Sequence, residues 1–207
     1  MSTHAVSHDD VIHFDPYGKK LGMWIFLFTE VLLFGGLFFV YATYRYLNHD
    51  AFHEGSGELD VVIGAINTVF LLTSSLTVAL SITALQKGDT RRSVNLIIIT
   101  ILFAGAFMMN KYYEWTLKYE HGLFPGMDHY NELSAGEAQS FNLYFLMTGL
   151  HGIHVIIGAI LLLIIAYHIK KGNVTKDRYV YLENGGLYWH LVDVIWIYLF
   201  PLFYLII

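Results

Sequence analysis

The sequence predicts an all-α integral membrane protein with five transmembrane helices in one bundle, and three observations lead to this fold class. Hydrophobic residues make up 56% of the 207 residues and charged residues only 14%, whereas a soluble domain has about 45–50% apolar and about 25% charged residues. The apolar residues fall into five long stretches. The polar chain that remains is too short to cover five such helices in water.

The five stretches divide the chain into a polar N-terminal tail, 1–20, and a transmembrane domain, 21–207. Each stretch exceeds the ~20 residues that a helix needs to cross ~30 Å of hydrocarbon. All faces of each stretch are apolar, which excludes the ~10-residue alternating strands of a membrane barrel. We expect helices at about 21–47, 60–86, 93–117, 140–169 and 183–207.

Each stretch has its own signals. The first is too long for the core of a secretory signal, so we interpret it as a retained span. The second carries hydroxyl and amide side chains suited to hydrogen bonds between helices. The third ends near Glu114, at the outer interface. The fourth follows Ser134 and Glu137, which have capping-box spacing, and its small residues allow close helix packing: Gly149, Gly152 and Gly158. The fifth carries a polar stripe beside Trp189 and Trp196.

The charge pattern predicts an orientation. Basic residues precede the first stretch and lie in the connections between the second and third and between the fourth and fifth: Lys19, Lys20, Lys87, Arg91, Arg92, Lys170, Lys171, Lys176 and Arg178. The other connections are mainly acidic. The positive-inside rule then predicts a multi-pass protein of the cell membrane, with its N-terminus in the cytoplasm and its C-terminus on the outer side.

Charge and cysteine content exclude several functions. A net charge of −5 argues against nucleic acid as a partner. The chain has no cysteine, so disulfides, thiolate metal sites and thiol catalysis are excluded.

Ionisable side chains within the apolar stretches are the candidate functional residues, because such groups are costly in hydrocarbon. Helix rise places six of them near one layer or on one polar stripe: Glu30, His151, His154, Glu183, His190 and Asp193. We place Glu183, His190 and Asp193 on one face of the last helix.

Each candidate has a structural and a functional interpretation. Glu30 is either protonated and hydrogen-bonded to a neighbouring helix, or takes part in proton movement or lipid binding. The pair His151 and His154 either packs or ligates a metal or haem. His190 with Asp193 resembles an oriented imidazole–carboxylate pair, for which a structural role is the first interpretation.

Two groups outside the hydrocarbon complete the candidates. Arg91 and Arg92 determine topology and can contact phospholipid headgroups. The N-terminal histidines, His4, His8 and His13, are either part of a solvated tail or a proton antenna on the inner side.

Four segments resemble subunit III of the heme-copper respiratory oxidases. Glu183 with Tyr188-Trp189-His190, Asp193 and Trp196 is similar to the family's last-helix signature. The penultimate helix resembles the family in Thr148-Gly-Leu-His151-Gly-Ile-His154-Val, the first in Phe28-Thr-Glu30, and the third in Tyr113-Glu114. The resemblance runs in order from about residue 20 to the end. Longer members have two further N-terminal helices, so this chain resembles the short, five-span bacterial form.

The resemblance implies a role in aerobic respiratory electron transport. Subunit III packs against subunit I, which holds the haems and copper and reduces oxygen to water while pumping protons. Subunit III binds no redox cofactor or metal and is not itself catalytic. It stabilises subunit I and supports proton uptake, with structural phospholipid bound. Subunit II and a small subunit IV are further partners, and cytochrome c or a quinol-oxidising complex is an indirect one.

Three alternatives remain at this stage. The oxidase belongs to the cytochrome c branch, as we expect, or to the quinol branch. A b-type cytochrome would use His151 or His154 with His190 as haem ligands. A proton-coupled transporter would use Glu30 and Asp193, although five spans do not pair into inverted repeats.

Overall fold

The computed structural model describes residues 16–57, 59–127 and 130–205, and confirms the predicted fold class. Five of its helices are long and apolar enough to cross a membrane. The elements are α1 (Pro16–Leu47), α2 (His49–Gly57), α3 (Val61–Gln86), α4 (Thr90–Glu120), the 3-10 turn η1 (Tyr130–Glu132), α5 (Ala135–Lys170) and α6 (Val180–Tyr204).

Short polar side chains begin three of the long helices. Asp60 accepts hydrogen bonds from the first amides of α3, and Asp89 does so for α4. Ser134 and Glu137 form the predicted capping box at the start of α5. Gly88 and Gly172 have φ of 83° and 77° in the connections that follow α3 and α5, a conformation that side chains other than glycine disfavour.

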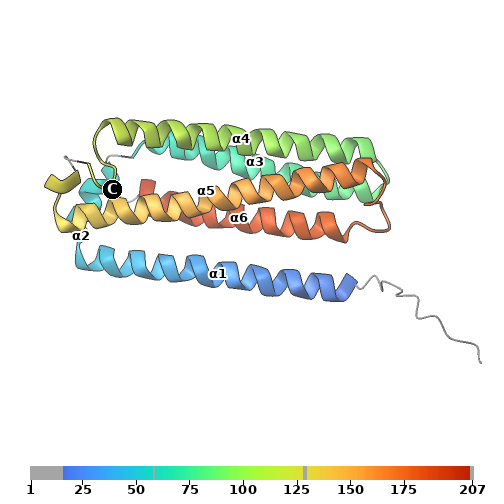
Figure 1. Cartoon of the computed structure of the whole chain (residues 1–207), viewed down its shortest axis with the longest axis horizontal. Helices are drawn as coiled ribbons and strands as arrows, with labels where there is room; N and C mark the ends of the chain where they lie inside the picture. The colour runs from blue at the N-terminus through green and yellow to red at the C-terminus, as the bar shows by residue number, and fades with distance from the viewer. Residues whose placement is uncertain (1–15, 58, 128–129, 206–207) are drawn as a thin grey trace, which may run out of the picture.

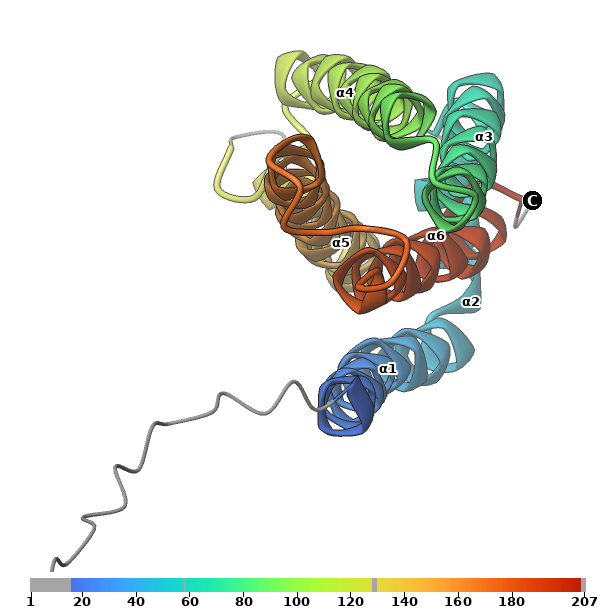
Figure 2. The ribbon, with the colours of Figure 1, turned by 90° about the vertical axis from the view of Figure 1, so that its right-hand side faces the viewer.

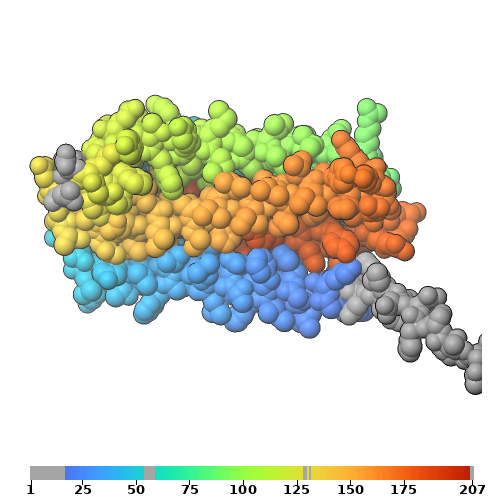
Figure 3. All heavy atoms as spheres, in the orientation of Figure 1, coloured from blue at the N-terminus to red at the C-terminus, as the bar shows by residue number. Residues whose placement is uncertain are grey.

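The long helices run side by side, and α6 holds a central position among them (Figures 1 and 2). It packs against α1, α3 and α5. The hairpin of α3 and α4 forms one side of the bundle, and α1 lies on the opposite side, against α5 and α6 (Figures 2 and 3). The short helix α2 was not predicted. It packs on the start of α5, where Gly136 lies against Asn48 and Ala51.

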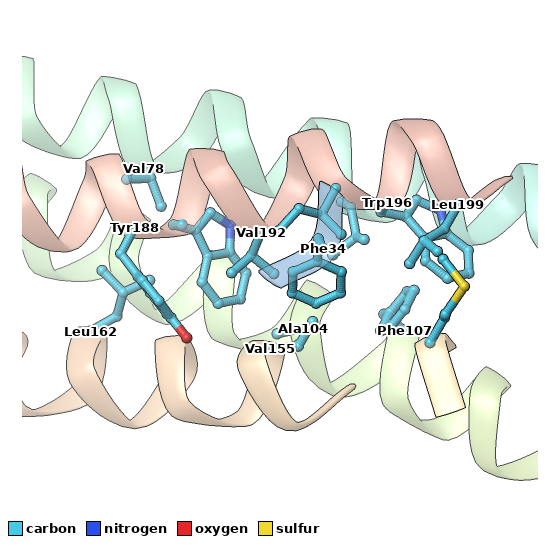
Figure 4. Packing of buried hydrophobic residues seen from close by; sticks show 14 of the residues in the cluster. Phe34, Val78, Ala104, Phe107, Val155, Leu162, Tyr188, Val192, Trp196 and Leu199 are labelled. Atoms are coloured by element: carbon cyan, nitrogen blue, oxygen red, sulfur yellow. The ribbon is translucent and has the colours of Figure 1, made fainter. Parts of the chain in front are cut away.

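Large aromatic side chains fill the space around α6. Trp189 and Trp196 are both fully buried, and Trp196 stacks edge-on against Phe107 of α4 with ring centroids 4.8 Å apart (Figure 4). Gly158 of α5 makes room for Trp189, because a Cβ at this glycine would lie 2.8 Å from the indole ring. This confirms the predicted close approach at Gly158. At Gly152, by contrast, a Cβ would meet its nearest neighbour at an ordinary 3.7 Å.

The two ends of the bundle differ in charge. The start of α1, the α3–α4 turn and the α5–α6 connection all lie at one end (Figure 1). These are the segments that carry the basic residues. The bundle therefore has one basic end, with the acidic connections and the end of α6 at the other.

Candidate functional site

The predicted polar residues do not converge on one site. They form separate clusters, and in each cluster the hydrogen bonds join different helices. Glu30 and His154 join α1 to α5, Ser75 and His190 join α3 to α6, and Glu114 belongs to a cluster that joins α4, α5 and α6. His151 stands apart from all three.

Glu30 is hydrogen-bonded to a neighbouring helix, α5, as its structural interpretation expected. Its Oε2 lies 2.8 Å from Nε2 of His154. The other ring nitrogen, Nδ1, lies 2.7 Å from the carbonyl oxygen of Leu150, one turn earlier in α5. Both side chains are about nine-tenths buried. Phe34 and Tyr188 pack their rings against the imidazole.

The geometry fixes the number of protons that this pair shares. A carbonyl oxygen can only accept, so Nδ1 of His154 must carry a proton. One further proton then lies between Nε2 and Glu30, either on the carboxyl or on the imidazole. The pair is electrically neutral in total in both cases, which suits its place inside the hydrocarbon. A neutral acid that donates to a neutral imidazole avoids separated charges, and we favour this form.

Three further bonds hold α1 on the bundle at its basic end, and one of them runs from the ammonium group of Lys19 to the hydroxyl of Tyr181 at 3.0 Å. Lys20 forms an ion pair with Glu183 of α6 at 2.8 Å, and the amide of Asn184 donates to the carbonyl oxygen of Lys19 at 3.2 Å. At the other end, the hydroxyl of Tyr41 donates to the carbonyl oxygen of Leu202 at 2.7 Å. Together with Glu30, these bonds join α1 to the bundle at three depths.

Glu183 and His190 have different partner helices, although their spacing places them on one face of α6. Glu183 points to α1, whereas His190 points to α3, where its Nδ1 lies 2.6 Å from the hydroxyl oxygen of Ser75. The spacing of seven residues predicts a shared face but not a shared partner. In the bundle, α6 passes between α1 and α3, so neighbouring parts of one surface meet different partners.

The expected His190–Asp193 pair is also not formed directly. The hydroxyl of Ser75 stands beside both side chains. Both oxygens of Asp193 are buried, and neither has a hydrogen bond of acceptable geometry among the described residues. The arrangement is a short row, His190–Ser75–Asp193, in which a hydroxyl separates the imidazole from the carboxyl.

His151 is packed as a core residue. It is fully buried between Phe107 and Trp196, with ring centroids 5.6 Å and 5.3 Å away. Its two nitrogens have no hydrogen-bond partner among the described residues. His151, His154 and His190 thus have different surroundings: His151 packs against α4 and α6, His154 bonds to α1, and His190 bonds to α3.

Glu114 is buried within the protein, and it belongs to a four-residue cluster. Lys111 contacts its Oε2 at 3.1 Å, and the hydroxyls of Tyr144 and Tyr204 each donate to its Oε1 at 2.6 Å. Lys111 also donates to the two phenol oxygens, at 3.1 Å and 2.8 Å. All four residues are buried.

The cluster satisfies its own hydrogen-bonding capacity. The ammonium group of Lys111 has three protons and three acceptors, and each phenol accepts one bond and donates another. Removing one partner of such a buried ion pair typically costs about 3–5 kcal/mol, because the other charge is left uncompensated. We interpret the cluster as a set of hydrogen bonds that holds α4, α5 and α6 together. Sequence reasoning missed Lys111, although its i, i+3 spacing from Glu114 inside an apolar stretch was a usable signal.

The basic end holds a large cavity. Its volume is about 660 Å³, and it lies between α1, α5 and α6. Met23, Phe26 and Leu161 contribute to its apolar wall, and His168, Asn173 and Arg178 to its polar lining. Arg91 and Arg92, the predicted headgroup contacts, are exposed at the start of α4, outside the lining of this cavity. His4, His8 and His13 lie outside the described residues.

Comparison with known proteins gives a consistent result. The family model of cytochrome c oxidase subunit III matches residues 2–206. Cytochrome c oxidase subunit 3 of Thermostichus vulcanus is 32% identical, over 98% of this chain and 92% of the relative. Cytochrome bo(3) ubiquinol oxidase subunit 3 of Pseudomonas putida is also 32% identical, over 90% and 84%. Heme-copper oxidase subunit I+III of Aeropyrum pernix is 29% identical, over 92% of this chain and 23% of the relative.

Substitutions of Glu30 test the shared-proton pair. Glu30→Gln keeps a donor for Nε2 of His154 and should leave the free energy of unfolding in mixed micelles nearly unchanged. Glu30→Ala leaves the imidazole without its partner and should lower that free energy by about 1–3 kcal/mol. Infrared spectra should show a protonated carboxyl band that is lost in Glu30→Gln.

The neighbouring Thr29→Val provides the control, because Thr29 is exposed and its hydroxyl bonds only within α1. An ionised carboxylate signal that disappears with Glu30→Gln would show that the proton resides on His154 instead.

Proposed function

Because the chain belongs to the cytochrome c oxidase subunit III family, we propose that it is a non-catalytic subunit that packs against subunit I of a proton-pumping terminal oxidase. The family match over nearly the whole chain carries this proposal. The polar clusters agree with it, since the contacts of Glu30 and Lys111 join helices to one another. A relative that unites subunits I and III in one chain supports subunit I as the main neighbour.

We assign the chain two tasks within the oxidase. It stabilises subunit I during turnover, and it supports proton uptake from the inner side. Haems and copper belong to the partner subunits in this proposal. Subunit II and a small subunit IV complete the assembly. We place the complex in the cytochrome c branch, although relatives carry both cytochrome c oxidase and quinol oxidase names.

Co-purification tests the proposal. A tagged form of this chain, extracted in mild detergent from its own membranes, should bring with it a subunit with haem and copper. The complex should consume oxygen with reduced cytochrome c as donor. The separated chain should show no haem absorption in the visible spectrum. One haem iron per separated chain would instead favour the b-type cytochrome, and oxygen consumption with quinol alone would place the complex in the other branch.

We propose that the basic end of the bundle faces the cytoplasm. The start of α1, the α3–α4 turn and the α5–α6 connection lie together at this end (Figure 1), and their lysines and arginines support the positive-inside orientation. A phosphatase reporter fused after the last residue should be active, since phosphatase folds only outside the cytoplasm. A C-terminal reporter that is active only in the cytoplasm would reverse the assignment.

We further propose that the cavity at the basic end holds a phospholipid. An apolar space between membrane helices, with basic and amide side chains in its lining, matches an acyl chain and an anionic headgroup. Arg178 and His168 would face the headgroup, and Phe26 and Leu161 the chain.

The phospholipid content of the purified complex tests this proposal. Arg178→Gln removes the headgroup charge and Leu161→Trp fills the apolar part, so each should lower the phospholipid retained by the purified complex by about one molecule. Lys87→Gln is the matched control, because it removes an equal charge at an exposed position of the same end but outside the cavity. Equal phospholipid in all four proteins would show that the cavity does not hold it.

A further inference from the structure

One strip of α6 remains uncovered between its contacts with α1 and α3. Its members are spaced three or four residues apart and so lie on one face: Leu187, His190, Val194, Ile197 and Pro201. Val194 and Ile197 are 45% and 43% exposed, and His190 is partly exposed. On either side, Tyr188 and Tyr198 contact rings of α1, and Trp189 and Trp196 bond to α3.

The depth of His190 makes its exposure costly. It lies ten residues after Val180, the start of α6, which corresponds to roughly 15 Å along the helix and therefore to the middle of ~30 Å of hydrocarbon. Lipid chains offer no hydrogen bonds there, so an imidazole nitrogen that faces them is left unsatisfied. Most other members of the strip are apolar, as expected for a surface that packs against a helix.

The row His190–Ser75–Asp193 determines which kind of hydrogen bond Nε2 of His190 can make. Asp193 is buried, and the hydroxyl of Ser75 lies between its carboxyl and the imidazole of His190. If Ser75 turns its single proton toward Asp193, Nδ1 of His190 must donate to Ser75. This arrangement satisfies the buried carboxyl, as buried polar groups generally require. It leaves Nε2 as an acceptor, and Nε2 has no hydrogen bond with any described residue.

We propose that this strip is the surface on which a transmembrane helix of the haem–copper subunit docks, and that this helix donates a hydrogen bond to Nε2 of His190. The donor is a hydroxyl, amide or indole group near the bilayer midplane. This inference rests on the proposed function, since that function supplies the partner. The fused relative also supports an intimate contact between the two subunits.

Photocrosslinking within the complex tests the strip and leaves His190 intact. A benzophenone amino acid is placed at Val194, on the strip, or at Leu102, which is 68% exposed on α4 at the far side of the bundle (Figure 2). The two sites lie at similar depths, about 21 Å and 18 Å from the starts of their helices. Illumination should join Val194 to the haem–copper subunit with at least tenfold higher yield than Leu102.

Three outcomes would overturn the inference: adducts of Val194 with lipid alone, adducts with a second copy of this chain, or equal yields at both sites. If the haem–copper subunit co-purifies but does not crosslink at Val194, only the docking strip fails. If it does not co-purify with the unmodified chain, the proposed function fails and the strip fails with it.

Substitution of His190 tests the hydrogen bond itself. His190→Phe should reduce the fraction of complex that survives a detergent challenge by roughly three- to tenfold, the range expected for one hydrogen bond between membrane helices. His190→Gln, which retains an acceptor, should restore most of it. Equal loss in both variants, with the Val194 crosslink preserved, would leave the docking surface in place and remove the role of Nε2.

Discussion

Hydrocarbon cannot form hydrogen bonds, and this constraint determines how the five long helices are joined. A polar side chain at bilayer depth must find its partner in the protein, and in this chain the partner usually comes from another helix. Glu30 reaches His154, Ser75 reaches His190, and Lys111 reaches Tyr144 and Tyr204. Apolar packing alone gives little preference for one helix neighbour over another in lipid. The polar bonds provide that preference.

The bonds are distributed unevenly. The helices α3 to α6 share large buried aromatic residues as well as polar clusters, whereas α1 has a mostly exposed surface and joins α5 and α6 through bonds at its two ends and its middle. The contacts of Trp189 and Trp196 described above are instead with α3, α4 and α5. The space between α1, α5 and α6 at the basic end is where the cavity lies.

The number of long helices, their approximate bounds and the fold class were predictable, because the length and hydropathy of the apolar stretches determine them. The Gly158 contact was also predictable from residue size. The hydrogen-bond partners of the polar side chains were not predictable, since depth along a helix says nothing about which neighbouring helix a side chain faces. Glu183 and His190 share one surface on an isolated helix but face α1 and α3 in the bundle. The row through Ser75 required the crossing of α3 and α6 to be known, and α2 lacked an apolar signal long enough to reveal it.

The cluster around Glu114 has a consequence for biosynthesis. Tyr204 follows Lys111 by 93 residues, so a ribosome has completed α4 and most of two later helices before the last phenol exists. During that interval Lys111 and Glu114 can offer only one another as partners within α4. A translocon that holds α4 until α6 arrives would keep this charge pair from lipid. Completion of the cluster would then mark the moment at which the helices can leave the translocon as one unit.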